Sequence, residues 1–337
     1  MDHPVTAPRR AHAAAPVRLD LAGGWTDVPP WSEIEGGLVV TASISRKVHV
    51  NVLPGGDAIH LLSEDLGVGV ELRPDGSRVG DDCLPLLEAG ARALPLGPHT
   101  LVTRSDVPQG SGLGSSGALG VALVAALSHA RGEALGVTEL AEAAWHLEAV
   151  DAGHPGGRQD QYAAALGGFQ LLAFGNGNVT AEPVAIDEGF REELGQSIVL
   201  CHTGTSRVSG RTIARVMDAY AAGNQKVIRA LRGLRDTAAR MKDALVAADL
   251  AQVAQLLDEN WRHQQALDAG MCTDGMAELE VAVRAAGAIG GKAAGAGAGG
   301  SMFFVAPGRT DAVAAAAREA GAEPLDFSWS SEGVRQW

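Results

Sequence analysis

The N-terminal quarter of the chain, and a segment shortly after it, carry short β-rich or alternating runs of hydrophobic and polar positions, separated by Gly, Pro and Asp. This pattern is typical of β-strands joined by hairpins, because successive side chains of a strand point to opposite faces of a sheet. The runs cover residues 17–21, 38–44, 47–53, 58–62, 68–72 and 99–103. This part of the chain is therefore predicted to be largely β-structure.

Two helices are predicted to follow. Residues 118–130 form an almost wholly apolar run that ends near Gly132, which is typical of a buried helix. A second helix is predicted to start at Thr138, and Glu148 would flank its apolar face, about 40° around the helix from Ala144. A carboxylate at that position needs a partner.

The second half of the chain changes character. Its strand candidates are residues 169–174, 197–202 and 302–306. Residues 175–188 are loop-like, residues 210–269 have helical periodicity, and residues 285–300 are mostly Gly and Ala. We predict a two-domain α+β protein with segregated helices and antiparallel sheet. The predicted parts are a flexible segment 1–14, an N-terminal domain 15–185 and a C-terminal domain 186–337.

Composition narrows the classes of partner. The chain has 337 residues and a formal net charge of −13, so it lacks the basic surface typical of proteins that bind nucleic acid or anionic membranes. Cys83, Cys201 and Cys272 are widely spaced, which favours a reducing compartment over a disulfide framework. No run of eighteen apolar residues and no signal-type segment occurs. We expect a cytoplasmic protein with small-molecule partners, for which a homodimer is compatible with the sequence.

A glycine- and serine-rich segment, residues 107–118, directly precedes the apolar helix. Glycines let backbone N–H groups converge on a phosphate, and the start of the helix adds a partial positive charge. The segment lacks the Lys-Ser/Thr pair of a Walker loop. Gly112, Gly114 and Gly117 match a dinucleotide fingerprint only weakly, because residues 104–109 separate the loop from its strand. The segment is therefore interpreted as a phosphate-binding loop, with a dinucleotide loop and a plain glycine turn before a helix as the two alternatives.

Three other segments accompany this loop: residues 15–27, Glu148 with residues 156–162, and residues 295–300. Together the four segments resemble the GHMP kinases. Residues 21–27, 157–164 and 260–262 are similar to the branch that contains heptose 7-phosphate kinase and L-fucokinase. The resemblance implies a β-rich N-terminal domain with the ATP loop and a ferredoxin-like α+β C-terminal domain.

The resemblance also implies an ATP and Mg²⁺ site. The residues that would wrap the ATP phosphates are Gly110, Ser111, Gly112, Leu113, Gly114, Ser115 and Ser116. Ser116, in preference to Ser115, would hold Mg²⁺ together with Glu148, in keeping with the preference of this ion for a few hard oxygen ligands. The alternative for Glu148 is a simple ion pair with a basic side chain.

Asp160 matches the catalytic aspartate of the family and would accept or orient the proton of the substrate hydroxyl. Arg18 matches the basic residue of the first motif, which would keep that aspartate ionised and steady the transferring group. Without the resemblance, Asp160 could be a helix cap and Arg18 an exposed charge.

The implied substrate site comprises Asp27, Gly24, Trp25, Gly157 and Gly297. Carboxylates suit vicinal sugar hydroxyls, since each oxygen accepts a hydrogen bond. Trp25 could stack on a sugar ring or could pack in a core.

The resulting hypothesis is an ATP- and Mg²⁺-dependent kinase for the anomeric hydroxyl of a sugar or sugar phosphate. Heptose 7-phosphate is placed ahead of L-fucose, with Arg46 and Lys47 as candidates to meet a distal phosphate. A sugar-binding regulator of the same fold and a nicotinamide oxidoreductase are the alternatives from other classes.

Overall fold

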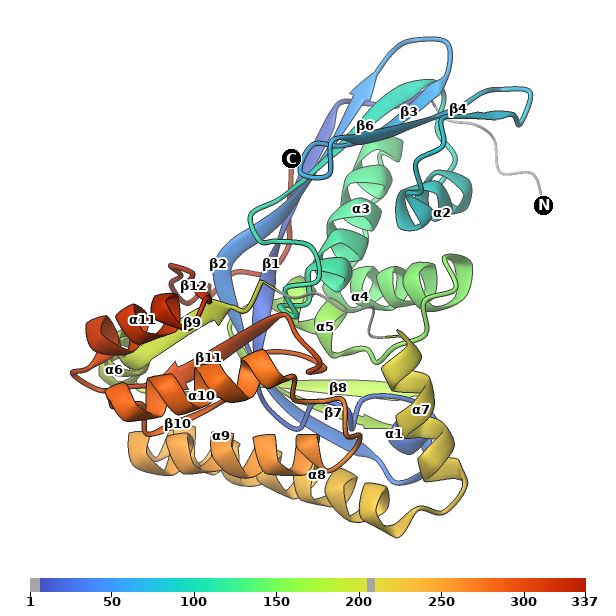
Figure 1. Cartoon of the computed structure of the whole chain (residues 1–337). Helices are drawn as coiled ribbons and strands as arrows, with labels where there is room; N and C mark the ends of the chain where they lie inside the picture. Colours follow the sequence, from blue (N-terminus) through green and yellow to red (C-terminus); the bar gives the residue numbers. More distant parts are fainter. Residues whose placement is uncertain (1–6, 205–209) are drawn as a thin grey trace.

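A computed structural model describes residues 7–204 and 210–337 of the chain (Figure 1). Its larger sheet has the strand order β13-β1-β2-β6-β3-β4-β5, and β7 pairs with β2 and β8. The pairs are antiparallel except β3 with β6. The strands are β1 (Ala11–Ala22), β2 (Gly37–Pro54), β3 (Ile59–Ser63), β4 (Val68–Leu72), β5 (Arg78–Val79), β6 (His99–Ser105), β7 (Phe169–Gly175), β8 (Asn178–Pro183) and β13 (Arg335–Gln336).

Helices from the first half of the chain pack beside this sheet. They are α1 (Trp31–Ile34), α2 (Pro85–Ala93), α3 (Ser115–Arg131), α4 (Val137–His146), the π-helical turn η1 (Leu147–Asp151) and α5 (Gln159–Leu166). The apolar α3 is buried along most of its length, and it ends at Gly132, whose φ is 79°. This turn lets the backbone N–H of Gly132 bond to the carbonyl oxygen of His129, and that of Glu133 to the carbonyl oxygen of Ser128. The prediction of a buried helix that ends at this glycine is confirmed.

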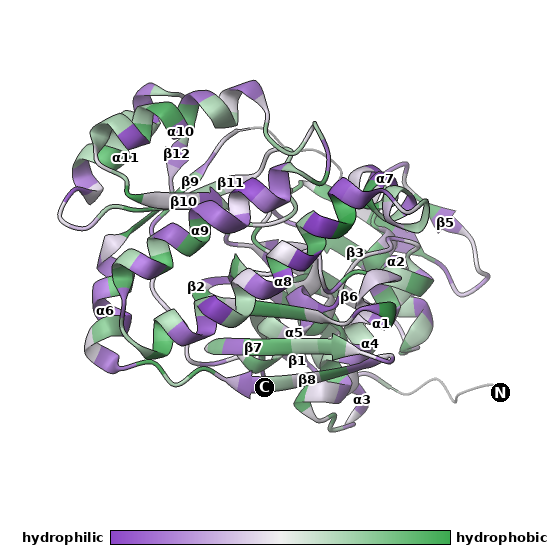
Figure 2. Ribbon diagram, turned by 90° about the horizontal axis from the view of Figure 1, so that it is seen from below, coloured by the Kyte–Doolittle hydropathy of each residue, from purple (hydrophilic) through white to green (hydrophobic). Residues whose placement is uncertain are grey.

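The smaller sheet has the strand order β10-β11-β9-β12. Its strands are β9 (Ile198–His202), β10 (Gly290–Ala293), β11 (Ser301–Val305) and β12 (Glu323–Pro324). The helices of this half are α6 (Glu188–Ser197), α7 (Gly210–Ala221), α8 (Gln225–Val246), α9 (Leu250–Gln265), α10 (Asp274–Ala286) and α11 (Thr310–Glu319). Hydrophilic and hydrophobic residues recur within each turn along α8 and α9, as expected for helices with one face on a core (Figure 2).

The two halves share a hydrophobic core. Ala238 and Met241 of α8 belong to the same buried cluster as Leu21 and Val39 of the larger sheet. The C-terminal strand β13 returns to pair with β1. The halves are therefore joined by packing and by strand pairing, in addition to the connecting chain.

Four secondary-structure predictions need correction. Residues 38–53 form one continuous strand, in which the pairing with β1 shifts register between Ser43 and Lys47 without ending the strand. The predicted loop 175–188 contains β8, which is almost fully exposed and so has no apolar pattern. β10 lies within the Gly/Ala tract. Residues 11–14, predicted to be flexible, are part of β1 and pair with β2 and β13, while residues 1–6 lie outside the described part.

Candidate active site

The glycine- and serine-rich loop connects β6 to the start of α3 at Ser115. Gly110, Gly112 and Gly114 have φ values of 69°, 73° and 75°, a backbone region that glycine adopts without strain. The Gly/Ala tract that follows β10 packs directly on this loop. A β-carbon at Gly295 would lie 2.4 Å from the carbonyl oxygen of Gly112. The expected approach of the third motif to the loop is therefore present.

Arg18 and Asp160 come together beside this loop. The Nε and Nη2 atoms of Arg18 lie 2.9 and 2.7 Å from Oδ1 of Asp160. Nη1 of the same guanidinium donates to the carbonyl oxygens of Gly112 at 2.7 Å and Ala294 at 3.1 Å. The Arg18 side chain is 5% exposed, so it is not the exposed charge that an isolated arginine on a strand would suggest. Four bonds to three groups fix the plane of its guanidinium.

Asp160 lies against the beginning of α3. A β-carbon at Gly114 would lie 3.2 Å from Cγ of Asp160, and one at Gly117 would lie 2.5 Å from its Cβ. Asp160 is the second residue of α5, whose N-cap is Arg158. The helix-cap alternative is therefore wrong, and the carboxylate faces the loop. A carboxylate next to a glycine-rich loop at a helix N-terminus is suited to proton acceptance beside a phosphate bound there.

Glu148 and Ser116 also meet at this end of α3. Glu148 lies in the π-helical turn and is hydrogen-bonded to the Ser116 hydroxyl. Its Oε2 accepts a hydrogen bond of 2.7 Å from Nε2 of Gln161. Burial raises the pKa of Glu148 to about 7, and the charge of Asp160 acts in the same direction. Its partners are thus a hydroxyl and an amide, and the oxygens of Ser116 and Glu148 suit Mg²⁺, which takes one or two protein ligands.

Within residues 7–204 and 210–337 no group of three or more His, Cys, Asp or Glu side chains could hold a metal. A magnesium site completed mostly by phosphate and water does not need such a cluster. The helices of the same residues include none that is long and apolar enough to cross a membrane.

Asp27 is buried beside the start of α5. It accepts hydrogen bonds from the backbone N–H of Gln159 at 3.1 Å and from the Gln159 side-chain amide at 3.2 Å. Burial raises its pKa to about 7, opposed by the Gln159 backbone bond and reinforced by the negative charges of Asp160 and Asp20. The structure therefore places the predicted sugar-contacting acid next to the predicted catalytic acid.

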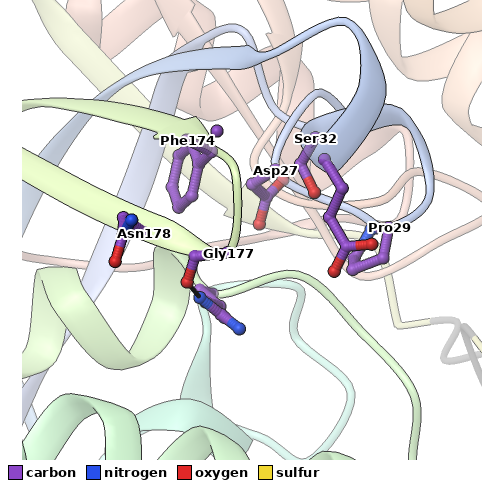
Figure 3. A pocket seen from close by; sticks show the side chains of 9 residues that line it. Asp27, Pro29, Ser32, Phe174, Gly177 and Asn178 are labelled. Carbon is purple, nitrogen blue, oxygen red and sulfur yellow. Dashed lines mark hydrogen bonds between the residues drawn. The ribbon is translucent and has the colours of Figure 1, made fainter.

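Asp27 also borders a small hollow between α1 and the β7–β8 turn (Figure 3). Arg158 lies at the same hollow. Its Nη1 donates to the carbonyl oxygen of Gly177 at 2.6 Å, and its guanidinium lies 4.0 Å from the ring centre of Trp145. These contacts hold a cation near Asp27, at the N-cap of the helix α5 that carries Asp160.

Three other predicted substrate residues have different surroundings. Trp25 is 4% exposed and packs in an apolar cluster with Trp31 and α7 and α8, which is the core-packing alternative. Gly24 lies under the carboxylate of Asp20. Gly297 lies against the carbonyl oxygen of Met271, within the second half of the chain. A stacking role for Trp25 is wrong for this structure, because the core encloses its ring.

Arg46 and Lys47 are far from Asp27. Gly37 packs on the backbone of Asp27, and Lys47 follows Gly37 by ten residues on the same strand. At about 3.3 Å per residue this is about 30 Å of strand. Arg46 donates to the carbonyl oxygen of Asp326 instead. The path of β2 and the contact of Arg46 therefore disfavour the expectation that these two residues meet the distal phosphate of a sugar held at Asp27.

Sequence reasoning missed several residues that support the site. Gln159 holds Asp27, and Gln161 holds Glu148. Asn260 of α9 accepts a 2.9 Å hydrogen bond from the backbone N–H of Gly23, and Lys292 of β10 pairs with Asp20 of β1. Gln159, Gln161 and Asn260 belong to segments that the motifs had already marked, and Lys292 lies just before the third motif. Most of their partners are distant in the chain and left no local signal.

Comparison with known proteins places this geometry in a family. The description "GHMP kinases N terminal domain" matches residues 84–168, and "GHMP kinases C terminal" matches residues 241–323. The D-glycero-alpha-D-manno-heptose 7-phosphate kinase of Campylobacter jejuni is 33% identical over 335 residues, which cover 96% of this chain and 97% of that protein. The bifunctional fucokinase/GDP-fucose pyrophosphorylase of Arabidopsis thaliana is 26% identical and covers 91% of this chain, but 31% of that protein.

Solved structures of sugar kinases are also similar to this chain over nearly its whole length. The D-glycero-D-manno-heptose 1-phosphate kinase of Bacteroides thetaiotaomicron superposes with a TM-score of 0.78 at 27% identity, covering 97% of this chain and 98% of that one. Lactococcus lactis galactokinase in complex with galactose gives a TM-score of 0.75 at 19% identity over 98% and 95% of the two chains, a likeness of fold. The two heptose kinases differ in the phosphate position that their names state. The sequence similarity over nearly the whole chain and the matches to both domains show that this protein belongs to the GHMP kinases and has their two-domain α+β fold.

Proposed function

We propose that this protein transfers the γ-phosphoryl group of ATP to the anomeric hydroxyl of a sugar, and that its substrate is a heptose 7-phosphate. The observation that carries the proposal is the position of Asp160, bonded to Arg18 and packed against the glycine- and serine-rich loop. A regulator that only binds a sugar has no need for a carboxylate held in this way. Similarity to the Campylobacter jejuni heptose 7-phosphate kinase supports the substrate class.

The residues have distinct roles in this proposal. Asp27 accepts hydrogen bonds from sugar hydroxyls. Asp160 accepts the proton of the reacting hydroxyl while the oxygen of that hydroxyl forms a bond to the γ-phosphorus. The bond between that phosphorus and the β–γ bridging oxygen breaks, and ADP leaves. Arg18 holds Asp160 in place, and its positive charge stabilises the negative charge that develops. Ser116 and Glu148 would hold Mg²⁺, which neutralises phosphate charge when bound.

Arg158 is the residue that we assign to the distal phosphate. It lies beside Asp27 on the hollow shown in Figure 3, in the position that Arg46 and Lys47 do not reach. Its charge is only partly offset, since Oε1 of Glu142 is 3.7 Å away. An arginine can form two parallel hydrogen bonds to a phosphate, which adds geometric selectivity to the charge attraction.

A screen for ADP release tests the function. The full chain is assayed with ATP and Mg²⁺ over heptoses with and without a 7-phosphate, L-fucose, galactose and mannose, and NMR of the product identifies the phosphorylated position. The Asp160→Asn variant should lose about 10²–10⁴-fold in kcat, the range of general acid–base catalysis. Asp151→Asn is the control, because Asp151 is an exposed acid at the end of the π-helical turn.

Turnover of L-fucose in preference to every heptose would replace the substrate and keep the enzyme class. ADP release that is equal in Asp160→Asn and wild type would contradict the assigned mechanism. Absence of turnover with every sugar would favour a binding role.

A further inference from the structure

A buried ion pair outside the reacting groups connects the two halves of the chain. The Lys292 and Asp20 side chains are 0% and 3% exposed. Nζ of Lys292 lies 3.0 Å from Oδ2 of Asp20 and donates to the Asp20 carbonyl oxygen at 2.6 Å. Because taking two charges out of water is costly, such a pair adds little to stability compared with an apolar pair of the same size. Its position in the site offers another reason for its presence.

The pair is connected to Arg18 along β1 and through the segment that follows Lys292. Asp20 follows Arg18 by two residues on β1, and the neighbouring charge of Arg18 acts on Lys292. The carbonyl oxygen of Ala294, two residues after Lys292, accepts hydrogen bonds from Nη1 of Arg18 at 3.1 Å and from the backbone N–H of Asp20 at 3.4 Å. The segment that carries Lys292 therefore contacts both residues of β1.

The carboxylate of Asp20 also supports the loop that carries Asp27. A β-carbon at Gly24 would lie 2.1 Å from Oδ2 of Asp20, so the loop rests directly on this carboxylate. The other oxygen, Oδ1, is buried and has no hydrogen-bond partner in the described part of the chain. Besides Lys292, charged neighbours of the pair are Arg18, whose charge acts on Lys292, and Asp27, on which the charge of Asp20 acts. Asp20 thus lies between a lysine of the second half and the predicted substrate loop.

We propose that Lys292 and Asp20 are a positioning pair. Lys292 holds the Asp20 carboxylate and fixes β10 against β1, and this contact sets the guanidinium of Arg18, which in turn orients Asp160. The same carboxylate contacts Gly24 and so fixes the position of the loop of residues 23–27 relative to β1. The inference rests on the proposed function, because it assigns a role toward the groups that the proposal places in the reaction.

Neutralising the pair separates positioning from stability. Lys292→Met alone leaves a buried, unpaired carboxylate and should lower the unfolding midpoint. The double variant Asp20→Asn/Lys292→Met removes both charges and should regain most of the wild-type midpoint. With positioning lost, its kcat should stay about 10²-fold below wild type, while KM for ATP changes less than about threefold. Lys242→Met, which removes a lysine from a surface pair with Glu182, is the control.

A double variant that regains both stability and kcat would overturn the proposal, since the pair would then be structural only. If Lys292→Met does not fold, the kcat of the double variant still distinguishes a positioning role from a purely structural one.

A readout without sugar keeps this test separate from the proposed function. The Nε–H signal of Arg18 in ¹H–¹⁵N spectra is assigned by its disappearance in Arg18→Lys. In the double variant this signal should shift or broaden, and in Lys242→Met it should be unchanged. An unchanged signal in the double variant would overturn the positioning role. Absence of turnover in the wild type would instead count against the proposed function and leave this measurement valid.

Discussion

The carboxylate of Asp27 occupies the space that a β-carbon at Gly157 would need. The two positions would be separated by 1.8 Å, far below van der Waals contact. Gly157 precedes α5 by two residues, so the absence of a side chain there lets the start of the helix approach Asp27. Gly156, its neighbour, has nothing within 4 Å of the equivalent position.

Gly157→Ala should therefore displace Asp27 and weaken sugar binding. Overpacking of this kind costs about 1–3 kcal/mol, so we expect KM for the sugar to rise about tenfold or more. Steady-state kinetics of Gly157→Ala and Gly156→Ala make the comparison. Equal KM values in the two variants would show that Asp27 does not contact the substrate.

Replacing Arg18 by lysine keeps the charge but removes the planar fork. A single ammonium cannot make all four bonds of Arg18 to Asp160, Gly112 and Ala294. We expect kcat to fall about 10²-fold or more, because the orientation of Asp160 is lost. Arg104→Lys, at an exposed arginine whose partner is Asp106, should stay within about twofold of wild type. A full rate in Arg18→Lys would mean that charge alone suffices.

The two serines at the start of α3 should differ in their effect on magnesium. Ser116 is hydrogen-bonded to Glu148. Ser116→Ala should raise the Mg²⁺ concentration for half-maximal activity about tenfold, and Ser115→Ala should change it little. The measurement is a magnesium titration at saturating ATP. The same shift in both variants would argue against the assignment of Ser116.

The raised pKa of Asp27 makes stability depend on pH. The pKa is about 7 in the folded protein, against an ordinary aspartate value of 3.8. The protonated form therefore favours folding, and this contribution is full below about pH 4 and is lost as the pH rises to about 7. Asn at this position does not titrate. From about pH 5 to about pH 8, the unfolding free energy of wild type relative to Asp27→Asn should fall by about 2.5 kcal/mol.

Urea unfolding of both proteins without ligands provides these values, and the other titrating groups cancel in the difference. A difference that is constant with pH would show that Asp27 is ionised throughout.

Arg158 should distinguish phosphorylated from unphosphorylated sugars. A hydrogen bond to a charged group is worth about 1.5–3 kcal/mol, so Arg158→Gln should raise KM for a heptose 7-phosphate about 10–100-fold and for the free heptose much less. Arg46→Gln is the matched control on β2. Equal changes for both sugars would remove Arg158 from the phosphate site.

The local elements follow from local pattern. Alternating residues predicted most strands of the larger sheet, and the apolar run before Gly132 predicted α3, because side-chain periodicity and glycine caps act within a few residues. β8 and β10 were missed since one is exposed and the other consists mainly of glycine and alanine, and neither has the pattern of a half-buried strand.

In the site, too, some features could be predicted from local sequence and others could not. The motifs around Arg18, the phosphate loop and Asp160 could be recognised in the chain by their residue types and order. Their distances could not, because Arg18 and Asp160 are 142 residues apart and the Lys292–Asp20 contact spans 272. Residue type determined which groups can exchange protons or hold phosphate, whereas the packing of β10 against β1 and of α5 beside α3 decided which of them meet. Contacts between distant segments depend on how whole elements bury their faces, and no local stretch of sequence contains that information.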